Sequence, residues 1–150
     1  MRPHLPSKSE IAPTGCDLDE LAAAEHFLGL TREQVLRDLS TGAMGGYIHT
    51  VDLTWMGDVA FYYYLPAFLD YLSSEASRGD CDTADGLISA LHNRLCNRRH
   101  PHVPMPEALS RHLAACLQQI TAHPDKWMLE HELDRSTLRE AQSILNLLRA

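Results

Sequence analysis

The chain has 150 residues, of which 45% are hydrophobic and 22% charged, and these values are typical of one globular domain and exclude a disordered or fibrous chain. Thirteen Lys and Arg against twenty Asp and Glu give a formal charge of −7, which disfavours nucleic acid and anionic membrane surfaces as partners. A basic protein is the more favourable partner for a surface of this sign.

The first sixteen residues contain three prolines and show no helical period. We therefore expect a flexible N-terminal arm over residues 1–16, followed by a single helical domain over residues 17–150. From Asp17 to Leu28 the apolar residues recur at steps of three and four, which predicts the first helix of that domain. Gly29 follows the last apolar position and is expected to end this helix.

The stretch "LTREQV" carries the clearest start signal of the chain. Thr31 and Gln34 stand at the two positions of a capping box, and Leu30 and Val35 stand at those of a hydrophobic staple. The short helix predicted here ends in the glycine-rich "STGAMGG". The segment Tyr47–Leu53 is rich in β-branched residues but has no obvious strand to pair with, so we expect a loop that lies on the core.

The stretch "FYYYLPAFLDYL", Phe61–Leu72, is dense in aromatic and leucine residues. On a helix its apolar positions cover well over half of the circumference, which is typical of a helix in the middle of a bundle. Pro66 removes a backbone donor and clashes with the preceding turn, so a kink is expected there with helix on both sides. The alternative, an aromatic box that lines an open cavity, requires several tyrosines to face solvent.

Three later segments show helical patterns. A helix is expected from Asp82 to residue 99, a proline-rich connector over residues 100–106, and a second helix over residues 107–123 whose apolar stripe includes Cys116. Residues 125–150 predict one long helix or two with a break near Asp134. The sum is an all-α, single-domain bundle of about six helices around a Pro-kinked aromatic central helix.

The aromatic stretch resembles the signature of an uncharacterised bacterial family of small proteins, over about residues 52–75. The positions that carry the resemblance are Phe61, Tyr63, Tyr64, Leu65, Pro66, Ala67, Phe68 and Leu69. Tyr62 occupies a place that is usually basic or polar in that family. The resemblance supports a fold and implies no mechanism, because the family has no assigned activity. Small acidic helical proteins of this kind also resemble toxin-immunity proteins at the level of fold and charge.

Cysteine usage and the absence of targeting patterns bear on the compartment. The four cysteines are scattered singly, the first sixteen residues lack the apolar core of a signal peptide, and no later run approaches the roughly 20 apolar residues of a membrane span. We expect a cytoplasmic protein with reduced thiols, no membrane contact and no cofactor.

The favoured function is a non-enzymatic protein-binding module, an immunity or antitoxin protein whose acidic surface engages a basic toxin. The expected contact residues are Asp58, Asp70 and Glu75, interpreted as exposed acids beside the aromatic helix, together with Tyr62. The apolar stripe of the last helix suits either the core or a second copy of the chain, so a homodimer is an open alternative.

The alternative function is a small metal-dependent enzyme. His92 and Cys96 stand four residues apart on one predicted helix, and His112 and Cys116 stand four apart on the next. If the two helices pack antiparallel, these side chains form a tetrahedral Cys2His2 zinc site. The opposing interpretation is that the cysteines are small core residues. The chain has no G-x-S-x-G nucleophile motif and no activated cysteine, so catalysis has no positive support in the sequence.

Overall fold

The computed structural model describes residues 4–96, 103–131 and 134–150, and all regular structure in these ranges is helical. The all-α class is therefore confirmed, with eight α-helices in place of about six. They are α1 (Lys8–Ile11), α2 (Leu18–Phe27), α3 (Arg32–Thr41), α4 (Gly46–Trp55), α5 (Asp58–Ser73), α6 (Cys81–Leu95), α7 (Glu107–Ala122) and α8 (Arg135–Arg149), with short 3₁₀ helices η1 (Glu75–Ser77) and η2 (Pro124–Trp127). Within these ranges no helix combines the length and the apolar character that a membrane span requires.

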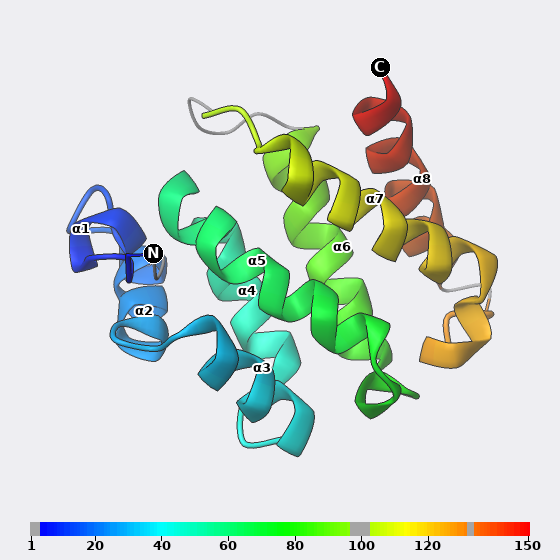
Figure 1. The fold of residues 1–150 in the computed structure, drawn as a ribbon, viewed down its shortest axis with the longest axis horizontal. Coiled ribbons are helices and arrows are strands. Elements are labelled where there is room, and N and C mark those ends of the chain that lie inside the picture. The colour runs from blue at the N-terminus through cyan, green and yellow to red at the C-terminus, as the bar shows by residue number, and fades with distance from the viewer. Residues whose placement is uncertain (1–3, 97–102, 132–133) are drawn as a thin grey trace.

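The helices form two layers, which Figure 1 shows one behind the other. In the front layer α5 lies between α3 and α7, and in the back layer α2, α4, α6 and α8 follow one another side by side. Helix α7 packs against α8 at one edge, and α1 joins α2 to α5 at the other. The core fills the space between the layers. There the ring of Phe27 from α2 lies 4.8 Å from that of Tyr64 from α5, measured between centroids.

Part of the expected N-terminal arm contacts the domain. Residues 8–11 form the short helix α1, which Ser7 caps through a complete capping box, while the flexibility expected of the arm stays a prediction. Ile11 is fully buried, and its carbonyl accepts a hydrogen bond from the backbone N–H of Gly57 at 3.1 Å. No local pattern indicates this contact, because the partner, Gly57, lies about 45 residues further along the chain.

Local end signals position the helices of the front layer. The capping box of Thr31 and Gln34 is present at the start of α3, and Gly42 ends that helix with a left-handed φ of 76°. The apolar stripe predicted for α7 is buried along its whole length. These elements follow the sequence prediction because each depends on residues within a few positions of one another.

One boundary of the later helices is corrected. Helix α6 begins at Cys81, one residue before the expected Asp82, because the carboxylate of Asp80 accepts the backbone N–H of Thr83 and so caps the helix. The expected continuation to residue 99 and most of the proline-rich connector lie outside the described residues. The break near Asp134 is confirmed, since η2 ends at Trp127 and α8 starts at Arg135.

The segment Tyr47–Leu53 is the clearest wrong prediction, because it forms helix α4 and not a loop. The cause is close packing between α4 and α6, which both carry a glycine opposite a threonine of the other helix. A Cβ atom on Gly46 would stand 1.7 Å from Thr83 Oγ1, and one on Gly86 would stand 2.1 Å from Thr50 Oγ1. The two helices approach at a distance that only glycine permits, and this contact outweighs the weak helix propensity of the β-branched residues.

The aromatic segment forms helix α5 as predicted, and nine of its residues are buried, including Phe61, Leu65, Phe68 and Leu72. Pro66 lies inside this helix, which has no interruption between its first and last residue. The kink expected at Pro66 stays a prediction. Tyr64 does not face an open cavity: it is fully buried, and its hydroxyl shares its proton between the carbonyls of Phe27 and Leu30, each at 2.9 Å.

Tyr64 makes the stability of the protein fall as the pH rises through the alkaline range. Burial raises its pKa above the ordinary tyrosine value of about 10, so its contribution is complete below that pH and declines as the pH rises further. We expect Tyr64→Phe to lose about 1–3 kcal/mol of unfolding free energy at neutral pH, because a buried carbonyl and a partly buried one lose the donor that they share. Above about pH 10 the variant should lose stability less steeply than the parent, as urea titrations at several pH values will measure. Equal slopes would contradict this role.

Candidate metal centre

Two histidines and one aspartate converge between α2 and α4. His26 lies near the end of α2, while His49 and Asp52 lie on α4. Asp52 Oδ2 is 2.7 Å from His26 Nδ1 and 3.1 Å from His49 Nδ1. Among the described residues, this is the one group of three or more His, Cys, Asp or Glu side chains whose ligand atoms all lie within 4.8 Å of one another.

The fold explains why these side chains meet. His49 and Asp52 are three residues apart on a helix, so they point from the same face. Helices α2 and α4 pack side by side, and the end of α2 brings His26 to the same place. The ring of Phe27 meets that of His49 edge-on at 5.6 Å, and the two imidazoles are 5.0 Å apart. This packing fixes the orientation of His49.

Burial falls off across the group from Asp52 to His26. The side chain of Asp52 is 7% exposed, that of His49 is 13% exposed, and that of His26 is 36% exposed. The carboxylate is thus held inside the protein, and solvent reaches the group from the side of His26. Because a carboxylate oxygen accepts hydrogen bonds, both imidazoles donate to Asp52 from Nδ1–H in this structure.

The Cys2His2 zinc site of the sequence analysis is not formed. His92, Cys96, His112 and Cys116 do not make a group of neighbouring ligand atoms in the described chain. The antiparallel pairing that the hypothesis required is missing, because α6 packs mainly on α4 and α8 whereas α7 packs on α5 and α8. Cys96 is exposed, and His112 pairs with Asp70 at 3.1 Å. Cys116 is a core residue whose burial raises the pKa of its thiol to about 11.

Two of the four expected partner-binding residues, Asp58 and Tyr62, make contacts within the protein. Asp58 is not an exposed acid: its side chain is 9% exposed, and it accepts a hydrogen bond from the buried guanidinium of Arg94 at 2.9 Å. It also accepts the backbone N–H of Val103 at 2.8 Å. Tyr62 donates its hydroxyl to the carbonyl of the same Val103. Both side chains therefore hold the segment before α7 against the start of α5.

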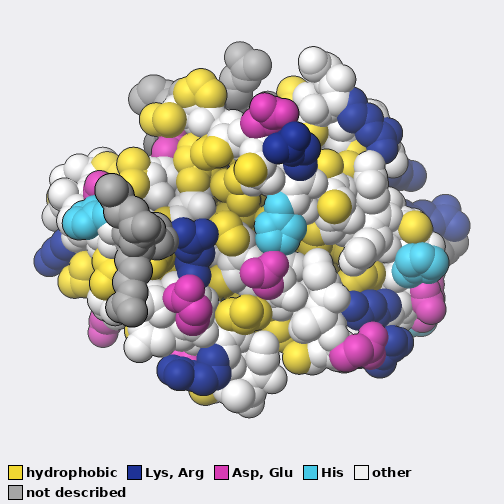
Figure 2. Space-filling model, in the orientation of Figure 1, with side chains coloured by type: hydrophobic (Ala, Val, Ile, Leu, Met, Phe, Trp, Pro, Cys, Tyr) yellow, Lys and Arg dark blue, Asp and Glu magenta, His cyan; other side chains and the backbone are white. Residues whose placement is uncertain are grey.

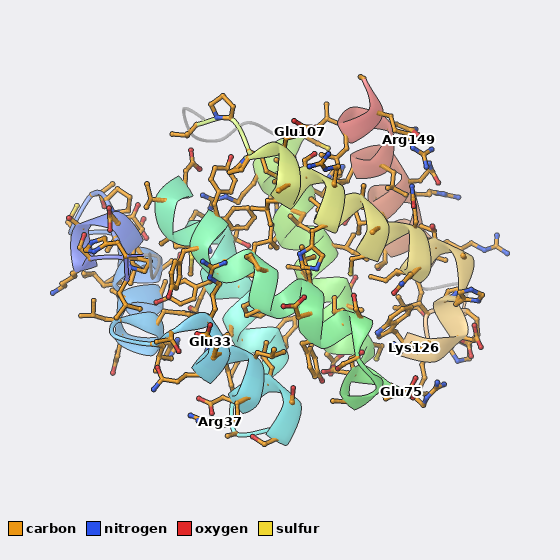
Figure 3. All side chains as sticks on the ribbon, in the orientation of Figure 1. Glu33, Arg37, Glu75, Glu107, Lys126 and Arg149 are labelled. Carbon is orange, nitrogen blue, oxygen red and sulfur yellow. The ribbon has the colours of Figure 1, made fainter. Side chains whose placement is uncertain are left out.

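The other two residues, Asp70 and Glu75, lie on the surface. Glu75 projects from the edge of the molecule below Lys126 in Figure 3, and a bidentate hydrogen bond from Arg78 lowers its pKa. The face in Figure 2 mixes Lys and Arg with Asp and Glu around apolar side chains, so its acids form no continuous patch there. A basic partner, the role in toxin immunity and the homodimer all stay predictions.

Comparisons of the chain with protein-family models, with curated proteins and with solved structures return no match. The resemblance of the aromatic segment to an uncharacterised bacterial family stays a prediction.

Proposed function

We propose that the protein binds one divalent first-row transition-metal ion of the zinc class through His26, His49 and Asp52. The observation that supports this proposal is the convergence of two imidazole nitrogens and one buried carboxylate oxygen from two helices. Imidazole is a good ligand for zinc, copper, iron and nickel, and a mixed set of nitrogen and oxygen disfavours calcium and magnesium.

The distances suit this class of ion. Metal–ligand bonds of about 2.0–2.2 Å at tetrahedral or octahedral angles place neighbouring ligand atoms roughly 3.0–3.4 Å apart. The distances from Asp52 Oδ2 to the two imidazole nitrogens are 2.7 and 3.1 Å, and all three ligand atoms lie within 4.8 Å of one another, so a shift of a few tenths of an ångström brings the two nitrogen–oxygen separations into this range. In each imidazole the proton moves from Nδ1 to Nε2, which frees the Nδ1 lone pair for the ion.

A set of three protein ligands leaves at least one coordination position for water or a small ligand. Structural zinc sites use four protein ligands, whereas catalytic sites use three and keep one position open. The exposure of His26 places solvent at this side of the group. The arrangement therefore favours a site that presents an activated water or a bound small molecule, and not one that serves only to hold the fold together.

Calorimetric titration of the purified protein with ZnCl₂ tests the proposal, after chelator treatment and alkylation of the thiols so that free cysteines do not bind zinc. We expect one ion per chain and a gain of about 2.7 kcal/mol in unfolding free energy when free zinc reaches one hundred times its dissociation constant. Asp52→Asn and His49→Ala should each weaken binding at least about tenfold, because the first replaces an anionic ligand with a neutral one and the second removes a ligand. Binding should also weaken at acid pH, since protons compete for the imidazole nitrogens.

His112→Ala is the matched control. His112 is also 36% exposed and also paired with an aspartate, Asp70, but it has no third ligand near it among the described residues. It should leave zinc affinity unchanged. If His112→Ala and Asp52→Asn have equal effects, or if calcium binds as tightly as zinc, the proposal fails.

A further inference from the structure

A second feature of the α2–α4 seam, one to two helical turns from the imidazoles, is a small cavity of about 190 Å³. Its apolar walls come from Pro13 and from Trp55 and Met56 at the end of α4. Its charged side chains are Glu20 of α2, Asp58 of α5 and Arg94 of α6, and Thr14 also lines it. Glu20 and Trp55 both line it although one starts α2 and the other ends α4, so the two helices run antiparallel.

The Asp58–Arg94 pair in this cavity is saturated by its own contacts. Arg94 donates to Asp58 and to the carbonyls of Leu53 and Thr54, and its guanidinium lies 4.2 Å from the centre of the Phe61 ring. Asp58 accepts from Arg94 with one oxygen and from a backbone N–H with the other. The positive charge of Arg94 and the negative charge of Asp58 neutralise each other, so this pair adds no net charge to the cavity.

Glu20 is different, because its carboxylate has no cationic partner in the part of the chain that the structure describes. The residue is 5% exposed, and its Oε2 accepts the N–H and the hydroxyl of Thr14 at 3.0 and 2.6 Å. Oε1 has no hydrogen-bond partner among the described residues. Every side-chain oxygen of these residues that is fully enclosed does have a partner, so Oε1 is not fully enclosed. Oε1 therefore reaches open space, and the cavity is the space that Glu20 lines.

We infer that this cavity binds a small organic cation with a primary ammonium group, which donates to Glu20 Oε1 while its alkyl part packs against Trp55 and Met56. The three charged side chains leave one unit of negative charge, so a cation is favoured and a carboxylate or phosphate is repelled. A hydrated metal ion fits poorly, since one carboxylate among apolar walls supplies too few oxygens. The cavity is smaller than a drug-sized site, and the indole of Trp55 adds attraction for a cation.

Nuclear magnetic resonance tests the inference, because the chain has two tryptophans and therefore two indole N–H signals. The probe is n-butylammonium, compared with butan-1-ol and butyrate of similar size, with a chelator present so that the result is independent of the metal proposal. We expect n-butylammonium to shift the Trp55 signal, assigned with Trp55→Phe, and to leave that of the buried Trp127 in place. Butan-1-ol should bind at least about tenfold more weakly and butyrate should not bind.

Glu20→Gln keeps the size of the side chain and removes its charge, so n-butylammonium affinity should fall at least about tenfold. Glu107→Gln, which alters an exposed acid paired with Arg111, should have no effect. The inference is overturned if n-butylammonium leaves the Trp55 signal unmoved, if the alcohol binds the unmodified protein equally well, or if Glu20→Gln in a folded state binds within about twofold of the parent. The ligand series on the unmodified protein decides the matter even if that variant fails to fold.

Discussion

Replacing Arg94 with methionine should lower the free energy of unfolding by about 3–5 kcal/mol, the cost of breaking a buried ion pair from one side. Arg94 is 4% exposed, and its two terminal nitrogens hold Asp58 and the carbonyls of Leu53 and Thr54 at 2.9–3.0 Å. Methionine fills similar space but removes the positive charge that faces the buried carboxylate of Asp58 and the donor of the two carbonyls. Urea unfolding at neutral pH measures the loss.

Arg78→Met provides the control. Arg78 also forms a bidentate pair with a carboxylate, that of Glu75 at 2.9 and 3.0 Å, but both side chains are largely exposed. Water solvates the two charges when an exposed pair is broken, so we expect no resolvable change in stability. If the two methionine variants unfold at the same urea concentration, the contacts of buried Arg94 with Asp58 and with the carbonyls of Leu53 and Thr54 do not stabilise the protein.

Gly86→Ala should destabilise the protein by about 1–3 kcal/mol, although alanine is the better helix former by about 1 kcal/mol. The new Cβ would lie 2.1 Å from Thr50 Oγ1 and 3.1 Å from Thr50 Cβ. Thr50 cannot rotate away at low cost, because it is buried and its hydroxyl donates to the carbonyl of Tyr47 at 2.7 Å. Urea unfolding again gives the magnitude.

A double-mutant cycle isolates the contact between the two helices. Thr50→Ala removes Oγ1 and Cγ2, so the double variant Thr50→Ala with Gly86→Ala should recover part of the stability lost in Gly86→Ala alone. Gly45→Ser is the control, because a Cβ at Gly45 meets nothing within 4 Å and serine is a favourable N-cap residue for α4. Strict additivity of the two alanine effects would show that Gly86 is not needed for the approach of α4 to α6.

The elements that the sequence predicts well are those encoded by neighbouring residues. The capping box of Thr31 and Gln34, the buried stripe of α7 and the burial of Phe61 and Phe68 each follow from positions a few residues apart. Helix α4 follows from no such pattern. Its β-branched residues favour extended structure, and its helical state depends on glycine contacts with α6 some 40 residues away.

The same distinction between local and long-range contacts explains why the candidate site was not predicted from the sequence. His49 and Asp52 share a face only if their segment is helical, so the expectation of a loop concealed the His-x-x-Asp spacing that could have revealed the pair. Asp58 was expected to be an exposed acid because only its place beside the aromatic helix was considered, and its partner Arg94 lies on another helix. Their pairing across 36 residues is a property of the tertiary fold.

The contacts of the N-terminal segment bear on how far the chain can be shortened without loss of stability. Ile11 and Ala12 complete the packing around the start of α5, and Thr14 supplies both hydrogen bonds to Glu20. The periodic pattern suggests a start at Asp17. A chain shortened to that residue would expose the apolar surface that Ile11 and Ala12 cover, and exposed apolar surface promotes aggregation. The shortened chain would also lose Thr14, whose N–H and hydroxyl hold the carboxylate of Glu20 in place.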